Sequence, residues 1–79
     1  MRIIADIPHS DCKISILSMN QKYIIRIEQG SMEQIYKVSE ADVPTLENVK
    51  EIITDNFMQT CLERFNAMRK DLYEAMEKF

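Results

Sequence analysis

The sequence has a single glycine and a single histidine, and only two cysteines and two prolines, among its 79 residues. One glycine cannot build a glycine-rich phosphate loop, which excludes that class of nucleotide site. The cysteines, Cys12 and Cys61, lie far apart, so the chain has neither a Cys-x-x-Cys motif nor a disulfide framework. A Ser nucleophile elbow and an HExxH motif are also absent.

An excess of basic charge is missing as well. The net charge is −3, with ten basic and thirteen acidic side chains. Residues 1–39 carry five basic and four acidic side chains, and residues 40–79 carry five basic and nine acidic ones. Because neither half forms a basic stripe, we expect no nucleic-acid partner and no membrane partner.

Long apolar runs are absent too. The N-terminal stretch MRIIADIPHS is too short and too polar for a signal peptide or a membrane span. We therefore expect a cytoplasmic protein, a setting that favours two free thiols over a Cys12–Cys61 disulfide. The length predicts one domain over residues 1–79. The core of so small a chain contributes only about 3–5 kcal/mol to the free energy of unfolding.

The first half, residues 1–38, reads as four strands. The segments are rich in Ile, Tyr and Val and are separated by turn residues, and they span 2–7, 12–19, 22–29 and 32–38. A two-residue loop at 20–21 pairs Ile16 with Ile25 on one face and Lys13 with Glu28 on the other, as a hairpin favours.

The two outer hairpins extend this pattern. A four-residue loop at 8–11 pairs Ile7 with Cys12 and Asp6 with Lys13. The same register also pairs Ala5 with Ile14 and Ile3 with Ile16. A turn at Gly30-Ser31 places Glu28 opposite Glu33, which is mildly unfavourable and which a bulge at Gly30 would relieve.

These registers predict one apolar face and one mixed face. The inner face holds Ile3, Ala5, Ile7, Cys12, Ile14, Ile16, Tyr23, Ile25, Ile27, Tyr36 and Val38. The outer face is mostly charged, but Ile4, Leu17, Ile24 and Ile35 form a potential apolar patch on it. A contiguous exposed patch of this kind is a candidate interface.

The second half, residues 39–79, reads as helix. Ser39 to Asp42 has the form of a capping signal, Pro44 suits a first helical turn, and Asp55 is a candidate cap for a second helix. We predict helices over 44–54 and 56–78. One continuous helix is the alternative, because the apolar stripe runs through the break.

The second helix is longer and more apolar than the sheet requires. Its stripe contains Phe57, Cys61, Phe65, Met68, Leu72 and Met76, widened by Met58, Leu62, Tyr73 and Phe79. Such a helix spans roughly 34 Å, whereas the strands span roughly 20–25 Å. We expect the overhang to be covered by a second copy of the chain, with Met58, Leu62, Met76 and Phe79 as interface candidates.

Residues 7–12, IPHSDC, hold the only cluster of reactive residue types: His9, Asp11 and Cys12. A metal site needs three or four ligands around one point, and a Cys–His pair needs the thiolate within hydrogen-bond reach of the imidazole. The predicted register turns Cys12 inward and leaves His9 at the tip of the turn. We therefore predict a turn above a core cysteine, with no metal, cofactor or catalytic residue.

The stretches MRIIADIPHSDCKISI, KYIIRIEQG and EQIYK resemble a family of short bacterial proteins, of the kind found in Bacteroidota genomes, to which no activity is assigned. The resemblance implies a small cytoplasmic protein and supplies no catalytic residue.

Together these observations predict an α+β domain: a four-stranded antiparallel meander with one face covered by two C-terminal helices. The function that we expect is a non-enzymatic, homodimeric protein-interaction module. The alternative is a small metal, redox or ligand-binding protein that uses His9, Asp11 and Cys12.

Overall fold

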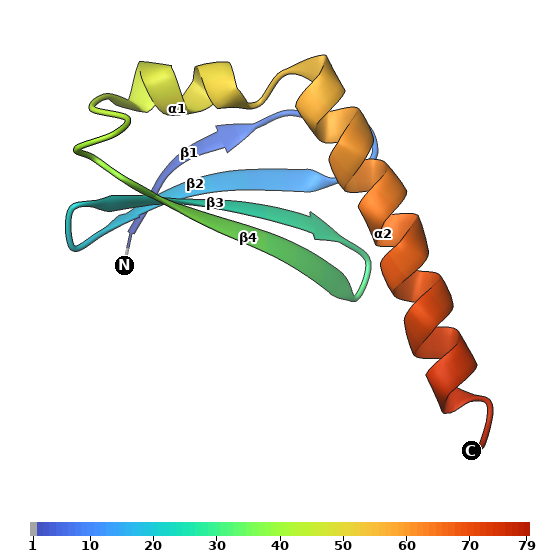
Figure 1. The fold of residues 1–79 in the computed structure, drawn as a ribbon. Helices are drawn as coiled ribbons and strands as arrows, with labels where there is room; N and C mark the ends of the chain where they lie inside the picture. The colour runs from blue at the N-terminus through green and yellow to red at the C-terminus, as the bar shows by residue number, and fades with distance from the viewer. Residues whose placement is uncertain (1) are drawn as a thin grey trace.

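The computed structural model describes residues 2–79 and confirms the α+β fold (Figure 1). Four strands form one antiparallel sheet in the order β1-β2-β3-β4, and two helices follow. The strands are β1 (Arg2–Ile7), β2 (Lys13–Met19), β3 (Lys22–Gln29) and β4 (Met32–Ser39), and the helices are α1 (Leu46–Ile52) and α2 (Asp55–Met76). Both helices lie on one face of the sheet.

The predicted registers of β2 with β3 and of β3 with β4 are confirmed. Asn20 and Gln21 both have positive φ, which gives a two-residue turn that matches the twist of the flanking strands. Gly30, at φ +59°, supplies the left-handed residue of the next turn. Glu28 does lie opposite Glu33, and no bulge at Gly30 relieves this like-charge pair.

The predicted register of β1 is wrong. Six residues, 8–13, separate the paired residues Ile7 and Ile14, instead of the predicted four between Ile7 and Cys12, and Ala5 lies opposite Ile16. This shift of two residues leaves Ala5, Asp6 and Ile7 on their predicted faces of the sheet. An irregularity between Ile3 and Ala5 then puts the residues before it on the opposite faces from those predicted.

The reversal exchanges two isoleucines. Ile3 now lies opposite Leu17 on the outer face and is 50% exposed, while Ile4 packs against the core. Asp6 is opposite Ser15, whose hydroxyl donates to Asp6 Oδ1 at 3.3 Å, so the expected Asp6–Lys13 pair does not form.

Two separate helices are confirmed, with shorter bounds and different caps. Thr45 and Thr54 are the N-caps, and their hydroxyls accept the backbone N–H of Asn48 and Phe57 at 3.1 Å. The predicted cap Asp55 is instead the first residue of α2. The Ser39 hydroxyl accepts the Ala41 N–H and forms a turn rather than a helix start.

The core lies between the inner sheet face and the helices. Its buried members are Ile14, Ile16, Tyr23, Ile25, Ile27, Met32, Val49, Met58, Cys61 and Phe65. Phe65 and Cys61 are almost fully buried, so the middle of α2 seals the sheet.

The end of α2 continues beyond this core. Residues 71–79, which we call the α2 tail, are all exposed, and Figure 1 shows the helix running past β4. The chain measures 46 × 25 × 19 Å, and its radius of gyration of 14.2 Å exceeds the value of about 12 Å expected for a compact domain of this length. The predicted overhang is therefore present.

The caps lead to the first prediction. We expect Thr54→Ala to lower the free energy of unfolding by about 1 kcal/mol, because the Phe57 N–H loses its acceptor. Urea denaturation measures the change. Thr60→Ala is the matched control: Thr60 lies inside α2 and donates only to the Asn56 carbonyl, so this variant should match the wild type within about 0.5 kcal/mol. Equal losses in both variants would contradict the role of Thr54.

Candidate functional site

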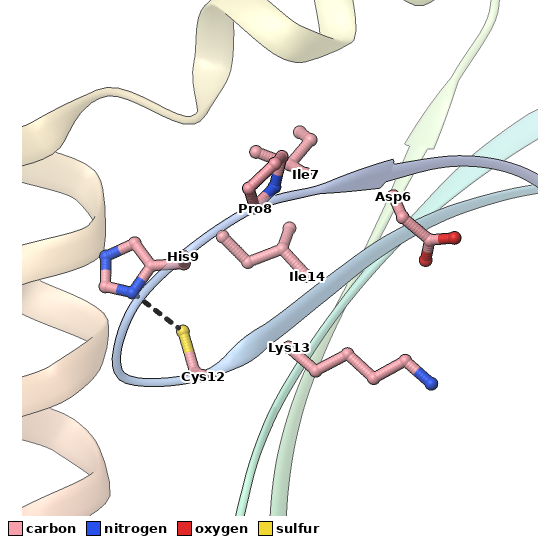
Figure 2. A pocket seen from close by; sticks show the side chains of 7 residues that line it. All are labelled: Asp6, Ile7, Pro8, His9, Cys12, Lys13 and Ile14. Atoms are coloured by element: carbon pink, nitrogen blue, oxygen red, sulfur yellow. Dashed lines mark hydrogen bonds between the residues drawn. The ribbon is translucent and has the colours of Figure 1, made fainter.

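The β1–β2 loop brings His9 and Cys12 together, contrary to the separation predicted from the sequence. The Asp11 N–H donates to His9 Nδ1 at 3.1 Å, and Cys12 Sγ lies 3.5 Å from the same nitrogen (Figure 2). Because Nδ1 accepts from the backbone, its contact with Cys12 fits a thiol donor. A hollow of about 330 Å³ lies beside the pair and is lined by Asp6, Ile7, Pro8, His9, Cys12, Lys13 and Ile14.

The electrostatics of this loop disfavour a reactive cysteine. Burial raises the pKa of the Cys12 thiol above its ordinary value, and the nearby Asp11 carboxylate raises it further. A nucleophilic cysteine needs the opposite shift, since the thiolate is the attacking form. Among residues 2–79, no group of three or more His, Cys, Asp or Glu side chains is placed to hold a metal ion.

The loop is tied to the rest of the fold by a chain of hydrogen bonds. The Gln29 side-chain amide donates to the Asp11 carbonyl at 3.1 Å. Arg69 of α2 donates to Gln29 Oε1 at 2.5 Å and to Asn66 Oδ1 at 2.6 Å. These contacts join the β1–β2 loop, the end of β3 and α2, which gives Asp11 a structural role through its backbone.

A second polar cluster, which the sequence analysis missed, lies where α2 crosses β4. It consists of Gln34, Tyr36, Cys61 and Arg64, and we call it the Gln34 cluster. The Gln34 amide donates to the Cys61 carbonyl at 2.8 Å, and Arg64 Nη1 donates to Gln34 Oε1 at 2.8 Å and to the Tyr36 hydroxyl at 2.6 Å. The signal that could have revealed it is Gln34 itself, a polar residue at an inward position of β4.

The Gln34 cluster has the properties of a structural contact between α2 and β4. Burial raises the pKa of Tyr36, and the neighbouring Cys61 raises it further, against a lowering by Arg64. The phenol therefore stays protonated at neutral pH. The Tyr36 ring also packs on Phe57, with ring centroids 5.4 Å apart. The cluster fixes α2 on β4 with the polar atoms of Gln34 satisfied.

The outer face of the sheet carries an apolar groove of about 200 Å³, lined by Leu17, Met19, Ile24, Arg26, Ile35 and Lys37. Leu17 and Ile24 form its floor and are only 4% and 5% exposed, whereas Ile35 on the edge strand is 51% exposed. Arg26 Nε lies 2.9 Å from Glu28 Oε1, although without hydrogen-bond geometry. Of the four residues predicted to form an exposed outer patch, only Ile35 is exposed, because Leu17 and Ile24 are buried and Ile4 packs against the core, while Ile3 lies on this face in its place.

The predicted interface residues of α2 divide along the helix. Met58 is buried in the core and Leu62 is partly buried, so neither belongs to the α2 tail. Met76 is half exposed and Phe79 is 97% exposed. The exposed stripe also includes Leu72 and Tyr73, which the list of interface candidates omitted.

Compared with known proteins, the chain matches no family model, no curated protein and no solved structure. The resemblance to short bacterial proteins therefore stays a prediction. Among residues 2–79, no helix combines the length and the apolar character that a membrane crossing requires.

The raised pKa of Cys12 predicts slow thiol labelling. At pH 7 we expect Cys12 in the folded protein to react more slowly with a disulfide reagent than an unstructured cysteine does. The rate should increase with pH and should still be increasing past 9.0, the ordinary value, because the raised pKa delays full conversion of the thiol to the thiolate. Cys12→Ser identifies the signal by removing it. Fast labelling at neutral pH would instead support the redox alternative.

The Gln34 cluster leads to a stability prediction. Arg64→Met keeps the apolar stem of the side chain but leaves the buried Gln34 Oε1 with only the Tyr36 hydroxyl, at 3.5 Å. We expect the free energy of unfolding to decrease by about 1–2 kcal/mol, as measured in urea. Glu63→Met, at an exposed neighbouring position, is the control and should change it by less than about 0.5 kcal/mol. An unchanged Arg64→Met variant would show that the hydrogen bonds of Arg64 contribute nothing to stability.

Proposed function

We propose that the protein is a small, non-enzymatic, homodimeric protein-interaction module. The observation that carries this proposal is the α2 tail, in which Leu72, Tyr73, Met76 and Phe79 are all exposed. Leu72 and Met76 follow Phe65 by seven and eleven residues, which places them on the same side of α2, while Tyr73 lies at the edge of this stripe and Phe79 follows the end of the helix. A helix with an uncovered apolar stripe favours association over isolation in water.

The size of this surface supports a dimer. With Tyr73 58% and Phe79 97% exposed, these two aromatic residues alone expose roughly 300 Å². A stable interface buries about 800 Å² on each partner, so the tail supplies a large share of one. A second copy is the simplest cover, because each chain brings the same surface.

The groove on the outer sheet face supports a further protein partner. Its apolar floor is bordered by the cations of Arg26 and Lys37. This combination suits an apolar segment flanked by acidic side chains. We also propose a reducing cytoplasm as its location, because both thiols are free and disulfides are rare there.

The metal or redox alternative has one supporting observation, the 3.5 Å contact between His9 Nδ1 and Cys12 Sγ. The raised pKa of Cys12 counts against it. We therefore keep the interaction module as the proposal.

The dimer is tested by light scattering and by sedimentation at micromolar concentrations. We expect the wild type to have twice the mass of one chain. The double variant Leu72→Gln with Met76→Gln should weaken the dimer at least about 100-fold, since four half-exposed apolar side chains lose burial in each dimer. Glutamine is a good helix former, so α2 should persist.

The control is Lys70→Gln with Glu74→Gln, which alters the opposite side of the same turns. Its dimer affinity should match that of the wild type. A monomeric wild type at tens of micromolar would overturn the proposal.

A further inference from the structure

The edge strand β4 is long and regular. It spans eight residues, all paired with β3 in unbroken register, and within residues 2–79 no strand pairs with its other side (Figure 1). An unbulged edge of this kind presents a row of free N–H and C=O groups that can pair with another strand.

The hydrogen-bond phase shows which residues face this open side. The Glu40 N–H donates to the Gln21 carbonyl at 3.1 Å. Because hydrogen-bonded pairs alternate along an antiparallel ladder, the backbone groups of Gln34 and Tyr36 point toward β3. Those of Glu33, Ile35 and Lys37 therefore point outward, to the open edge.

We propose that β4 pairs with β4 of a second copy, antiparallel and centred on Ile35, so that two sheets become one of eight strands. The inference rests on the proposed homodimer and specifies its geometry. The centred register joins Ile35 to Ile35 of the second copy through two backbone hydrogen bonds, which uses the outward-facing groups of both strands.

Charge selects this register. It places Glu33 opposite Lys37 of the second copy and, by symmetry, Lys37 opposite Glu33. Shifting the centre to Tyr36 would place Ile35 opposite Lys37 and Glu33 opposite Ser39, and both charge pairs would be lost. A one-residue shift would bring inward and outward side chains together.

The pairing also accounts for an unfavourable contact inside the chain. Glu28 and Glu33 lie opposite each other on β3 and β4. Like charges placed this way destabilise a sheet. In the proposed dimer, Lys37 of the second copy lies on the other side of Glu33, so the row of charges becomes favourable.

The same arrangement provides cover for the α2 tail. Helix α2 packs on β4 through the Gln34 cluster and then runs beyond this strand (Figure 1). Its apolar stripe continues on the side that faces the inner surface of the sheet. A sheet that continues past β4 places the second copy beneath this stripe, so one contact accounts for both unpartnered surfaces.

A cysteine at the symmetry centre tests the register. Opposite residues in a hydrogen-bonded pair have Cα atoms about 5.5 Å apart, within the disulfide range of about 4.4–6.8 Å. We therefore expect Ile35→Cys to give a disulfide-linked dimer in a glutathione buffer. Lys37→Cys is the matched control, equally placed on the open edge, but its two sulfurs would lie on strand positions about 14 Å apart. It should stay unlinked, as should the wild type.

A charge-reversal cycle tests the side-chain pairing. Glu33→Lys and Lys37→Glu should each weaken the dimer about ten-fold, because each replaces two attractive contacts with two repulsive ones. The double variant should restore the wild-type affinity. Glu33→Lys should also raise the free energy of unfolding of the monomer, since it removes the Glu28–Glu33 repulsion. This measurement is the control: a variant that weakened the dimer only by damaging the fold would be less stable than the wild type.

The outcomes separate this inference from the proposed function. A wild type that stays monomeric overturns both. A dimer that dissociates with Leu72→Gln and Met76→Gln, but in which Ile35→Cys does not cross-link and charge reversal has no effect, overturns β4 pairing alone. Selective linking of Ile35→Cys, together with rescue by the double reversal, supports it.

Discussion

The packing of the middle of α2 on the inner sheet face is the contact on which the rest of the structure depends. Phe65 and Cys61 are almost fully buried there, and Gln34 binds the Cys61 carbonyl in the same place. Because α2 is anchored at its centre, its direction is fixed, and so is the position of every residue beyond it. The exposed tail is a direct consequence of where this anchor lies.

Much of the fold could be predicted from the sequence, because β2, β3 and β4 are joined by two-residue turns that leave the register no freedom. The register of the first hairpin, β1 with β2, could not be predicted. A four-residue link from Ile7 to Cys12 and a six-residue link from Ile7 to Ile14 both keep Ile7 and Ile14 inward, so alternation alone does not distinguish them. The irregularity near Ile4 has no glycine or proline to announce it, and its effect on Ile3 appears only when the sheet is complete.

The candidate sites show the same division. The exposed apolar stripe of α2 was predictable, because helix length and strand length follow from residue counts. The His9–Cys12 contact and the Gln34 cluster were not, since both need side chains from separate elements or a bent loop. Arg64 has no special signal in the sequence. It is one of several charged residues on α2, and only the position of β4 distinguishes it.

The strand order has a consequence for how the chain acquires its structure. In a meander every strand pairs only with its neighbours in sequence, so the sheet consists of local contacts that close early, and single hairpins form in about 1–10 μs. The contact of helix α2 with β4 joins residues that are 27 positions apart, Gln34 and Cys61, so we expect it to form after the hairpins. A growing chain would therefore complete its sheet, with β4 at the edge, before the helix that seals it emerges, and during that interval the inner apolar face lies uncovered and is open to aggregation.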